Sequence, residues 1–341
     1  MSTTMRNWSF ASVWNDSLSK AQDRPIEVRE RIFASEMGGS MIDRYLKMTG
    51  VKPTNPPNNR ALRKFQAGNI WEYIVSLVLR RSGILYDHQQ RIEFKVDNLL
   101  PVSGRLDFLA GGIPDFEQAQ REVADMHLPE MLNVAAMDII ESLKHDWDGR
   151  EFKKKVLEIK SSSDIMFNKY MVSGADTRHR LQAFHYLKGL DMEDGAIVYI
   201  NKDNCMIQEF PVYNPSNIED LYVKDIQEIT YYVRNNERPG PEPEVIIDSS
   251  TSKFSMNFKV EYSPYLSMIY GYPDSEAYRA KYQKLVAGIN RVLSRVVEGK
   301  KMTEKNKEII EEAKKICNWD EVVDIAVENA KIGNFVPEEE E

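Results

Sequence analysis

The sequence predicts an α/β fold in which helices flank a mixed central sheet and a helical C-terminal region follows. A long amphipathic stretch, ALRKFQAGNIWEYIVSLVLRRSG, has the periodicity of a helix. After it, helical and strand-like patterns follow one another as three strands, a helix, two strands and a helix, which is typical of α/β proteins. A Pro-rich stretch, ERPGPEPE, separates these patterns from further helical ones.

The individual elements follow from local patterns. The cluster PTNPPNN supplies the start of the long helix, and Gly83 closes it. Alternating residues predict strands at Ile92–Val96 and from Val102, and KKVLEIKSS predicts a third. A helix RHRLQAFHYLKGL, strands GAIVYINKDN and CMIQEFPVY, and a helix NIEDLYVKDIQEITYYVRNN complete the core. The chain thus divides into a helical N-terminal segment (1–55), a core (56–236) with a helical insertion at about 113–150, a linker (237–257) and a helical C-terminal region (258–341).

Composition limits the class of protein. With 42% hydrophobic and 29% charged residues, the chain has an ordinary globular balance. The longest apolar run, IVSLVL, is too short to cross a membrane, and MSTTMRNWSF has no signal-peptide pattern. Cys205 and Cys317 form no metal-binding spacing. We therefore expect a soluble cytoplasmic protein without a membrane partner. The net charge of −8 argues against a passive nucleic-acid coat, because such a coat needs excess Lys and Arg.

Two strand patterns carry charged residues of chemical interest. In VSGRLDFLA, the strand period of two places Asp107 on one face with Arg105 and Ser103. In KKVLEIKSS, Glu158 and Lys160 share a face about 7 Å apart. Carboxylates hold hard divalent cations, and a nearby ammonium offsets negative charge during phosphodiester hydrolysis. Taken alone, each pattern also fits a surface residue or a cross-strand salt bridge.

The combination of motifs is more specific than any one of them. Gly68-Asn-Ile-Trp-Glu72 lies on the long helix, and Gly104-Arg-Leu-Asp107 and Glu158-Ile-Lys160 lie on strands. Gln182-Ala-Phe-His-Tyr186 follows on a helix, where residues four apart share a face. With these motifs in this order, residues 36–236 resemble the RecB-like branch of the PD-(D/E)XK nucleases. The resemblance implies a restriction-endonuclease-like core and a metal-dependent deoxyribonuclease.

The resemblance also implies roles for individual residues. Asp107, Glu158, the Ile159 carbonyl and Glu72 would hold Mg²⁺ or Mn²⁺; the carboxylate at Glu72 stands where many relatives have His. Lys160 would be the catalytic lysine. Gln182 and Tyr186 would position DNA or the catalytic residues. The DNA-binding residues would be Arg105, Lys169, Arg178 and Arg180.

Surrounding residues suggest a binding surface. Basic side chains precede the Glu158 strand at Lys153–Lys155 and start the long helix at Arg60, Arg63 and Lys64; these could ring the site or be simple solvated faces. Trp71, Phe167 and Tyr170 are candidates to stack on bases, although Trp71 fits a core position better. His185 is expected to pack or to contact phosphate rather than act as a base.

One departure from the family concerns the long gap between Asp107 and Glu158. We interpret 117–145 as a helical insertion near the site that gates or guides a strand. The alternative, that Asp115 or Asp138 is the true ligand, is disfavoured because neither lies on a strand pattern.

A second departure concerns an iron–sulfur cluster that some RecB-like relatives bind through four cysteines. Ser40, Val260, Ser263 and Ile269 stand in the corresponding positions here. We expect no cluster, with the two segments still packed together through apolar side chains.

The predicted function is therefore a DNA nuclease, with exonuclease action on single-stranded or double-stranded ends in phage or bacterial recombination, repair or processing. The expected location is the cytoplasm of a bacterial or phage-infected cell. A homo-oligomer or a recombination-protein partner is compatible with the sequence. The alternatives are a non-catalytic nucleic-acid-binding subunit with a nuclease fold and an RNA endonuclease. The terminal EEEE is expected to be a solvated tail.

Overall fold

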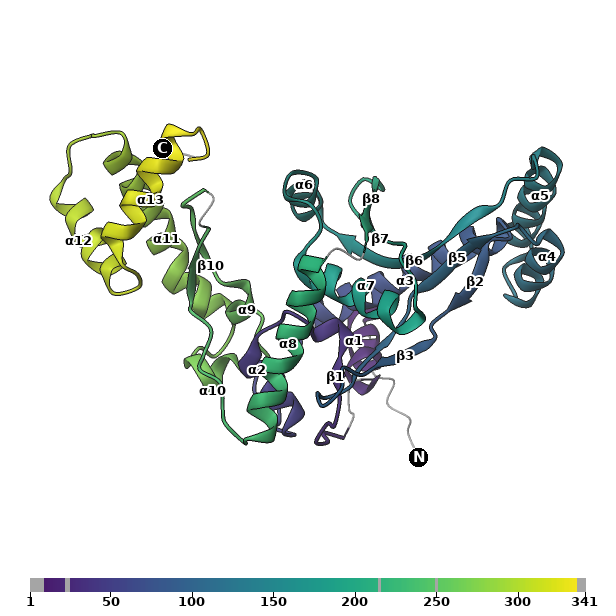
Figure 1. The fold of residues 1–341 in the computed structure, drawn as a ribbon, viewed down its shortest axis with the longest axis horizontal. Coiled ribbons are helices and arrows are strands. Elements are labelled where there is room, and N and C mark those ends of the chain that lie inside the picture. Colours follow the sequence, from purple (N-terminus) through teal and green to yellow (C-terminus); the bar gives the residue numbers. More distant parts are fainter. Residues whose placement is uncertain (1–8, 22–24, 214–215, 249–250, 336–341) are drawn as a thin grey trace, which may run out of the picture. The chain divides into compact units, whose positions relative to one another are not determined.

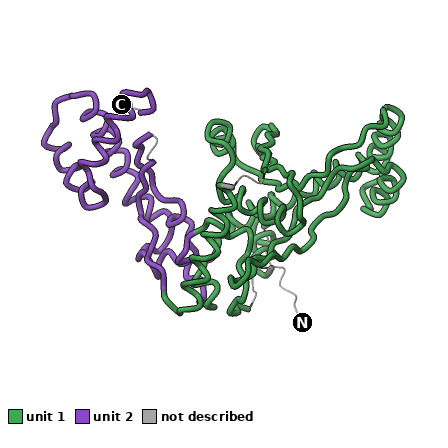
Figure 2. Tube along the Cα trace, in the orientation of Figure 1, with its two compact units in different colours: residues 1–39, 44–51, 57–237 green, residues 40–43, 52–56, 238–341 purple. Residues whose placement is uncertain are grey.

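The chain forms two compact units in a computed structural model that describes residues 9–21, 25–213, 216–248 and 251–335. The first unit comprises residues 1–39, 44–51 and 57–237, and the second comprises 40–43, 52–56 and 238–341 (Figure 2). The first unit thus contains residues of both the expected N-terminal segment and the expected core. The EEEE tail lies outside the described residues.

A five-stranded sheet forms the centre of the first unit (Figure 1). Its strands are β2 (Leu85–His88), β5 (Phe108–Gly112), β6 (Phe152–Ser162), β7 (Gly195–Asn201) and β8 (Ile207–Val212), in the spatial order β2-β5-β6-β7-β8. β6 and β7 are parallel, whereas the other neighbours are antiparallel. The predicted α/β class with a mixed sheet is therefore confirmed. All residues of β7, GAIVYIN, are buried, as expected for an apolar central strand.

Helices cover both faces of this sheet. α3 (Asn59–Arg81) starts at Asn58, whose side chain accepts a hydrogen bond from the Ala61 N–H. Its apolar side packs on one face through a cluster that includes Leu79, Phe108 and Ile159. α7 (Thr177–Leu190) lies against β6 and β7 and is joined by α8 (Ser216–Arg234). The result is a helix, sheet and helix layering around one core.

A smaller sheet corrects the expectation of one continuous strand in VSGRLDFLA. β1 (Ile32–Phe33), β4 (Val102–Arg105) and β3 (Arg91–Phe94) form a three-stranded sheet in the order β1-β4-β3. The chain leaves β4 after Arg105 and joins the larger sheet as β5 at Phe108. Alternation fails between the two strands, because Leu106, Asp107 and Phe108 are all buried. Asp107 therefore lies on the segment that connects two sheets.

The expected insertion is a helical pair. α4 (Phe116–Asp125) and α5 (Glu130–Asp146) pack on each other around a small core that includes Val123 and Ile140. The Asp115 side chain caps α4 by accepting a hydrogen bond from the Gln118 N–H at 2.8 Å. This capping explains Asp115 as a structural residue.

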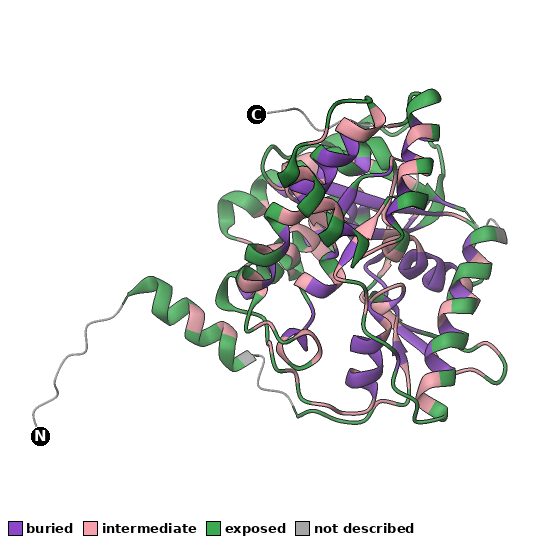
Figure 3. Cartoon of the chain, turned by 90° about the vertical axis from the view of Figure 1, so that its left-hand side faces the viewer, coloured by how far each residue is buried: buried purple, intermediate pink, exposed green. Residues whose placement is uncertain are grey.

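The remaining elements of the first unit are short or peripheral. α1 (Phe10–Ala21) is exposed along most of its length (Figure 3) and meets α3 where the Trp14 indole donates to the Gln66 side chain at 2.6 Å. The others are η1 (Ala34–Glu36), α2 (Met41–Met48), whose first turn belongs to the second unit, and α6 (Asp164–Ser173).

The second unit is mainly helical, as predicted for the C-terminal region. The long helix α11 (Ser275–Val297) runs through its core with Tyr278, Ile289 and Leu293 buried. The shorter helices are α9 (Phe258–Glu261), α10 (Leu266–Tyr270), α12 (Glu304–Lys314) and α13 (Trp319–Lys331). No helix in the described part of the chain is long and apolar enough to cross a membrane.

A small hairpin occupies part of the stretch 237–257 that the sequence suggested to be a linker. β9 (Val245–Ile247) and β10 (Phe254–Met256) pair in antiparallel fashion. The Asn290 side chain of α11 bonds both the N–H and the carbonyl of Phe254, at 2.8 and 2.9 Å. Since these bonds come from a distant helix, the Pro-rich composition could not reveal the hairpin.

The segments that would carry iron–sulfur ligands meet in the second unit. The Ser263 hydroxyl donates to Asp43 at 2.7 Å, and Ser40, Ser263 and Val260 are buried. The segments are joined by this polar contact, and the expected packing through apolar side chains stays a prediction. The expectation of no cluster remains a prediction.

Candidate functional site

Asp107 is fixed against β6 at the junction of the two sheets. Its side chain is 8% exposed, and its Oδ2 accepts a hydrogen bond from the Ile159 N–H at 2.8 Å. Antiparallel pairing of β5 with β6 begins one residue later, at Phe108 opposite Leu157. The Asp107 side chain therefore accepts a hydrogen bond from β6 where a backbone carbonyl of β5 would otherwise accept it. This bond uses only one of the two carboxylate oxygens of Asp107.

Glu158 and Lys160 form an ion pair beside Asp107. Glu158 is completely buried, and the Lys160 ammonium binds its Oε1. The Oε2 of Glu158 is buried and has no hydrogen-bond partner among the described residues. A buried carboxylate oxygen without a partner is unusual in folded proteins and calls for an explanation such as an ion.

Glu72 approaches this pair from α3. Its carboxylate is partly buried and accepts a long hydrogen bond of 3.5 Å from the Gln89 amide. One turn earlier, Gly68 lies close to β6, because a Cβ there would stand 3.8 Å from the Ser161 hydroxyl. This part of α3 therefore lies against the sheet at ordinary van der Waals distance.

Electrostatic interactions connect these side chains. Burial and the neighbouring Asp107 raise the pKa of Glu158 to about 8. Burial also raises the pKa of Asp107, and burial with Asp107 raises that of Glu72. Burial lowers the pKa of Lys160, but the surrounding carboxylates outweigh this effect and raise it overall. Burial and the neighbouring carboxylates thus disfavour the charged forms of these groups, and Lys160 compensates only in part.

Backbone geometry places the Ile159 carbonyl near Asp107. In an extended strand the N–H and C=O of one residue point toward the same neighbouring strand. Since the Ile159 N–H binds Asp107, its carbonyl points to the same side, at the edge where β5 gives way to Asp107. This oxygen is positioned to join a carboxylate donor set.

The site combines oxygen donors that suit a divalent cation with side chains that already have other partners. Among the described residues, no three His, Cys, Asp or Glu side chains already surround one cation position. In this arrangement Lys160 occupies one oxygen of Glu158 and Gln89 engages Glu72. The chemistry of the set nevertheless suits Mg²⁺ or Mn²⁺, because the donors are carboxylate and carbonyl oxygens and Glu158 Oε2 lacks a partner.

Gln182 and Tyr186 support the segment that leads to Asp107. The Gln182 amide donates to the Tyr186 hydroxyl at 3.2 Å, and this hydroxyl donates to the Arg105 carbonyl at 2.9 Å. Gly104 permits the contact, because a Cβ there would stand 2.7 Å from Tyr186 Cε1. The glycine of the GxxD motif and the tyrosine of the QxxxY motif therefore form one packing unit.

We expect Gly104→Ala to destabilise the protein. Its methyl group would stand 2.7 Å from both Ala34 Cβ and Tyr186 Cε1, so the sheet or helix must shift. Overpacking of this kind costs about 1–3 kcal/mol, measurable as a lower midpoint of urea unfolding. Gly240→Ala is the matched control, because nothing lies within 4 Å of a Cβ at Gly240. Equal midpoints for the two variants would contradict the packing argument.

The predicted DNA-binding residues differ in their surroundings. Arg105 and Lys169 are exposed, and Arg180 is partly buried. Arg178 pairs with Asp176, with its Nη2 at 3.1 Å from Oδ2. Arg105 and Lys169 are thus the most solvent-exposed of the four.

Two of the lysines that precede Glu158 have partners of their own. Lys153 pairs with Asp194, and Lys154 lies 3.8 Å from the centre of the Tyr86 ring. Lys153 precedes Glu158 by five residues on β6, which corresponds to about 17 Å. Lys153 therefore does not lie beside Glu158.

Burial corrects the expected base-stacking residues. Phe167 and Tyr170 are buried, and Tyr170 stacks on Tyr199 at 4.2 Å, so neither ring is available to a base. Trp71 packs against the core cluster under α3, as the sequence favoured. His185 is fully buried and bonds the Tyr222 hydroxyl at 2.9 Å, which confirms a packing role.

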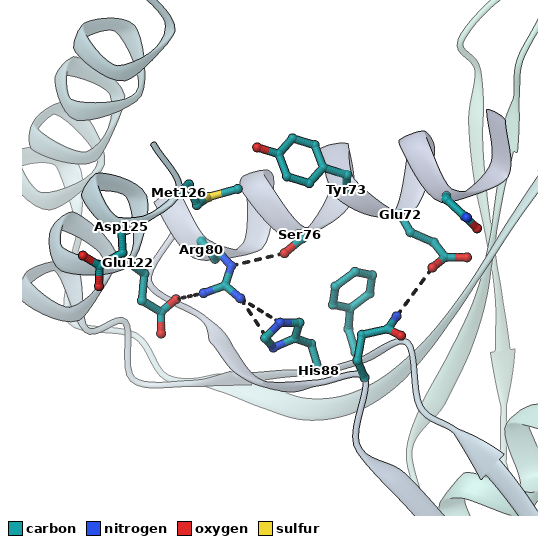
Figure 4. A pocket seen from close by; sticks show the side chains of 11 residues that line it. Glu72, Tyr73, Ser76, Arg80, His88, Glu122, Asp125 and Met126 are labelled. Atoms are coloured by element: carbon teal, nitrogen blue, oxygen red, sulfur yellow. Dashed lines mark hydrogen bonds and ion pairs between the residues drawn. The ribbon is translucent and has the colours of Figure 1, made fainter. Parts of the chain in front are cut away.

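The structure also reveals residues that sequence reasoning missed. A cavity of about 480 Å³ lies beside Glu72 (Figure 4) and is lined in part by Tyr73, Arg80, His88 and Met126. These residues share no motif, and Met126 comes from the inserted helical pair. The sequence indicates only that Asn69, Tyr73 and other lining residues of α3 share one helix face, because they are three or four residues apart.

We expect Glu158 to make the metal-free protein less stable as the pH rises. Its folded-state pKa of about 8 lies above its ordinary value of 4.5, so the folded state binds the proton more tightly. The resulting stabilisation is fully present below pH 4.5 and is lost as the pH rises through about 8. Urea unfolding from pH 5 to 9 should show that Glu158→Gln flattens this decline. The same slope in both proteins would contradict the assignment.

Similarity to known proteins is found among solved structures. The sequence matches no protein-family model and no curated protein. Among solved structures, the protein SSO0001 aligns with a TM-score of 0.38 at 16% identity, over 65% of this chain and 87% of that one. An alkaline exonuclease from Laribacter hongkongensis, LHK-Exo, aligns with a TM-score of 0.34 at 11% identity, over 67% of this chain and 96% of that one. LHK-Exo in complex with dAMP aligns with a TM-score of 0.33 at 11% identity, over 61% of this chain and 92% of that one.

Proposed function

We propose that this protein is a metal-dependent deoxyribonuclease that hydrolyses phosphodiester bonds. The observation that carries the proposal is the state of Glu158. This carboxylate is fully buried, one oxygen binds the Lys160 ammonium, and the other has no partner among the described residues. A structural ion pair would be expected to satisfy both oxygens, because an unsatisfied buried charge is costly.

A divalent cation would complete this arrangement. Asp107, Glu158 and the Ile159 carbonyl would hold it, and Glu72 would complete the carboxylate set. Burial is the largest cause of the raised pKa values of Glu72, Asp107 and Glu158, so a bound cation would favour their charged forms. When bound, Mg²⁺ or Mn²⁺ supplies polarisation of the phosphate and acidification of water.

The chain's own residues carry out the remaining tasks. Lys160 donates a hydrogen bond to the attacking water or to a phosphate oxygen and offsets the negative charge that develops there. The water oxygen forms a new bond to phosphorus, the bond to the leaving sugar oxygen breaks, and that oxygen takes up a proton. Tyr186, which accepts a hydrogen bond from Gln182, donates to the Arg105 carbonyl and so fixes the approach to Asp107. Arg105 and Lys169 bind the DNA backbone without reading sequence.

The proposal extends to the mode of action and the setting. The substrate is a single-stranded or double-stranded DNA end, cut by an exonuclease in bacterial or phage recombination, repair or processing. The reaction takes place in the cytoplasm and needs no iron–sulfur cluster. The enzyme could act as a homo-oligomer or together with a recombination protein.

A digestion of end-labelled linear DNA beside closed circular DNA tests this function. With Mn²⁺ or Mg²⁺ we expect the linear DNA to be degraded and the circle to persist, and EDTA should stop the reaction. Glu158→Gln, which keeps the shape of the side chain, should remove the activity. No cleavage of either DNA by the wild-type protein, or faster cleavage of RNA, would overturn the proposal.

A further inference from the structure

The cavity beside Glu72 belongs to the first unit and extends along α3 (Figure 4). Glu72 lies at one end, and Arg80 lies two helical turns further along, which corresponds to about 12 Å. Its volume of about 480 Å³ falls within the range of about 300–1,000 Å³ that is usual for small-molecule sites. Since Glu72 is also a proposed metal ligand, whatever occupies the cavity lies next to the reacting phosphate.

The lining offers flat apolar surfaces and polar amides. Tyr73, which is 48% exposed, and Met126 contribute a ring and a thioether. Asn69 and Gln89 contribute amides that both donate and accept hydrogen bonds. Nucleobases bind proteins through this combination of ring stacking and hydrogen bonds at the base edge.

The positive charge at the far end of the cavity is already paired. The Arg80 guanidinium binds Glu122 at 2.7 Å and Ser76 at 3.2 Å, and it also contacts His88 at 2.9 Å. Burial and the neighbouring Arg80 lower the pKa of His88, so this imidazole is neutral at physiological pH. Arg80 therefore has little capacity left for an incoming phosphate.

The net charge of the lining is negative. Glu72, Glu122 and Asp125 bring three carboxylates, against one guanidinium from Arg80. A phosphate that entered this space would be repelled, whereas an uncharged nucleoside would not. Glu122, Asp125 and Met126 come from the end of α4, so the inserted helical pair forms the far wall.

We propose that this cavity is a subsite for one uncharged terminal nucleoside, whose single phosphate reaches the metal centre beside Glu72. The inference rests on the proposed nuclease function and adds the form of its substrate. The strand end is held with its last base on Tyr73 and its terminal hydroxyl toward Glu122 and Asp125. A chain that continued beyond this nucleoside would place a second phosphate among the carboxylates. The protein therefore removes one nucleotide at a time from an end that bears a hydroxyl group.

Binding of deoxyadenosine, which has no phosphate, tests the subsite without catalysis. Calorimetry or NMR titration of the metal-free protein should show binding that weakens about tenfold or more in Tyr73→Ala, because a stacking surface is lost. Ile74→Ala is the matched control, since Ile74 is the next residue on α3, is 41% exposed and does not line the cavity. The catalytically inactive Glu158→Gln should bind deoxyadenosine like the wild type. Absent binding, or equal binding by Tyr73→Ala, would overturn the subsite.

A second measurement compares DNA ends. Oligonucleotides that end in a hydroxyl should be degraded about tenfold or more faster than those that end in an added phosphate, tested separately at 5′ and 3′ ends. Glu122→Gln, which removes a carboxylate and frees Arg80, should narrow this difference. Equal rates on both ends would overturn the subsite while leaving the nuclease function intact. Tyr73-dependent binding of deoxyadenosine with no DNA cleavage would instead overturn the nuclease function and leave the subsite standing.

Discussion

Asp107→Asn is expected to lower the rate of metal-dependent DNA cleavage by a factor on the order of a thousand or more. The amide can still accept the hydrogen bond from the Ile159 N–H, so the junction between the two sheets is preserved. The variant loses one negative charge from the proposed cation site, and neutral oxygen binds Mg²⁺ less tightly than carboxylate. Cleavage of end-labelled linear DNA at saturating Mn²⁺ measures the effect.

The matched control for this prediction is Asp138→Asn. Asp138 is exposed on α5, in the insertion that separates Asp107 from Glu158, and the same chemical change there should leave activity unchanged. Urea unfolding in the absence of metal should show no loss of stability in Asp107→Asn, because burial already raises the pKa of this carboxyl. Full activity in Asp107→Asn, or an equal loss in Asp138→Asn, would remove Asp107 from the proposed site.

Lys160→Met should separate catalysis from metal binding. Methionine keeps much of the length of the side chain but removes the ammonium that binds Glu158 Oε1. We expect cleavage to fall about a hundredfold to a thousandfold, because charge stabilisation at the phosphate is lost. Mn²⁺ should bind more tightly, because the cation no longer competes with the ammonium for that oxygen. Calorimetric titration with Mn²⁺ and a cleavage assay give the two readings.

Lys155→Met provides the control on the same strand. Lys155 is exposed and lies five positions before Lys160, so its loss should change neither metal affinity nor cleavage appreciably. A Lys160→Met protein that binds Mn²⁺ more weakly, or that cuts DNA at the wild-type rate, would contradict the role assigned to this lysine.

Much of the fold could be predicted because its periodic signals are local. The helix-period pattern of α3 and the apolar run of β7 correspond directly to elements of the structure. The break between β4 and β5 could not be predicted, because VSGRLDFLA alternates without interruption. Its division depends on pairing with β1 and β3 on one side and with β6 on the other. Which strands pair with each other is decided by the folded chain as a whole, so the sequence of a short segment does not show it.

The candidate site shows the same limit. Asp107, Glu158, Lys160 and Glu72 could be proposed from motif order, and their mutual electrostatic effects support the grouping. The Tyr186 hydroxyl bond to the Arg105 carbonyl could not be derived, because it joins residues far apart in sequence. The error over Phe167 and Tyr170 had a similar cause, since neither ring's burial follows from its neighbours along the chain.

The position of Asp107 between two sheets also bears on how the proposed metal site would form during folding. The register of β4 is set by β1 and β3, whereas that of β5 is set by β2 and β6. A chain that has assembled only one sheet leaves this carboxylate unplaced relative to Glu158. Mn²⁺ should therefore bind during refolding only after both sheets have formed. The time course of Mn²⁺ binding would then follow the assembly of the two sheets.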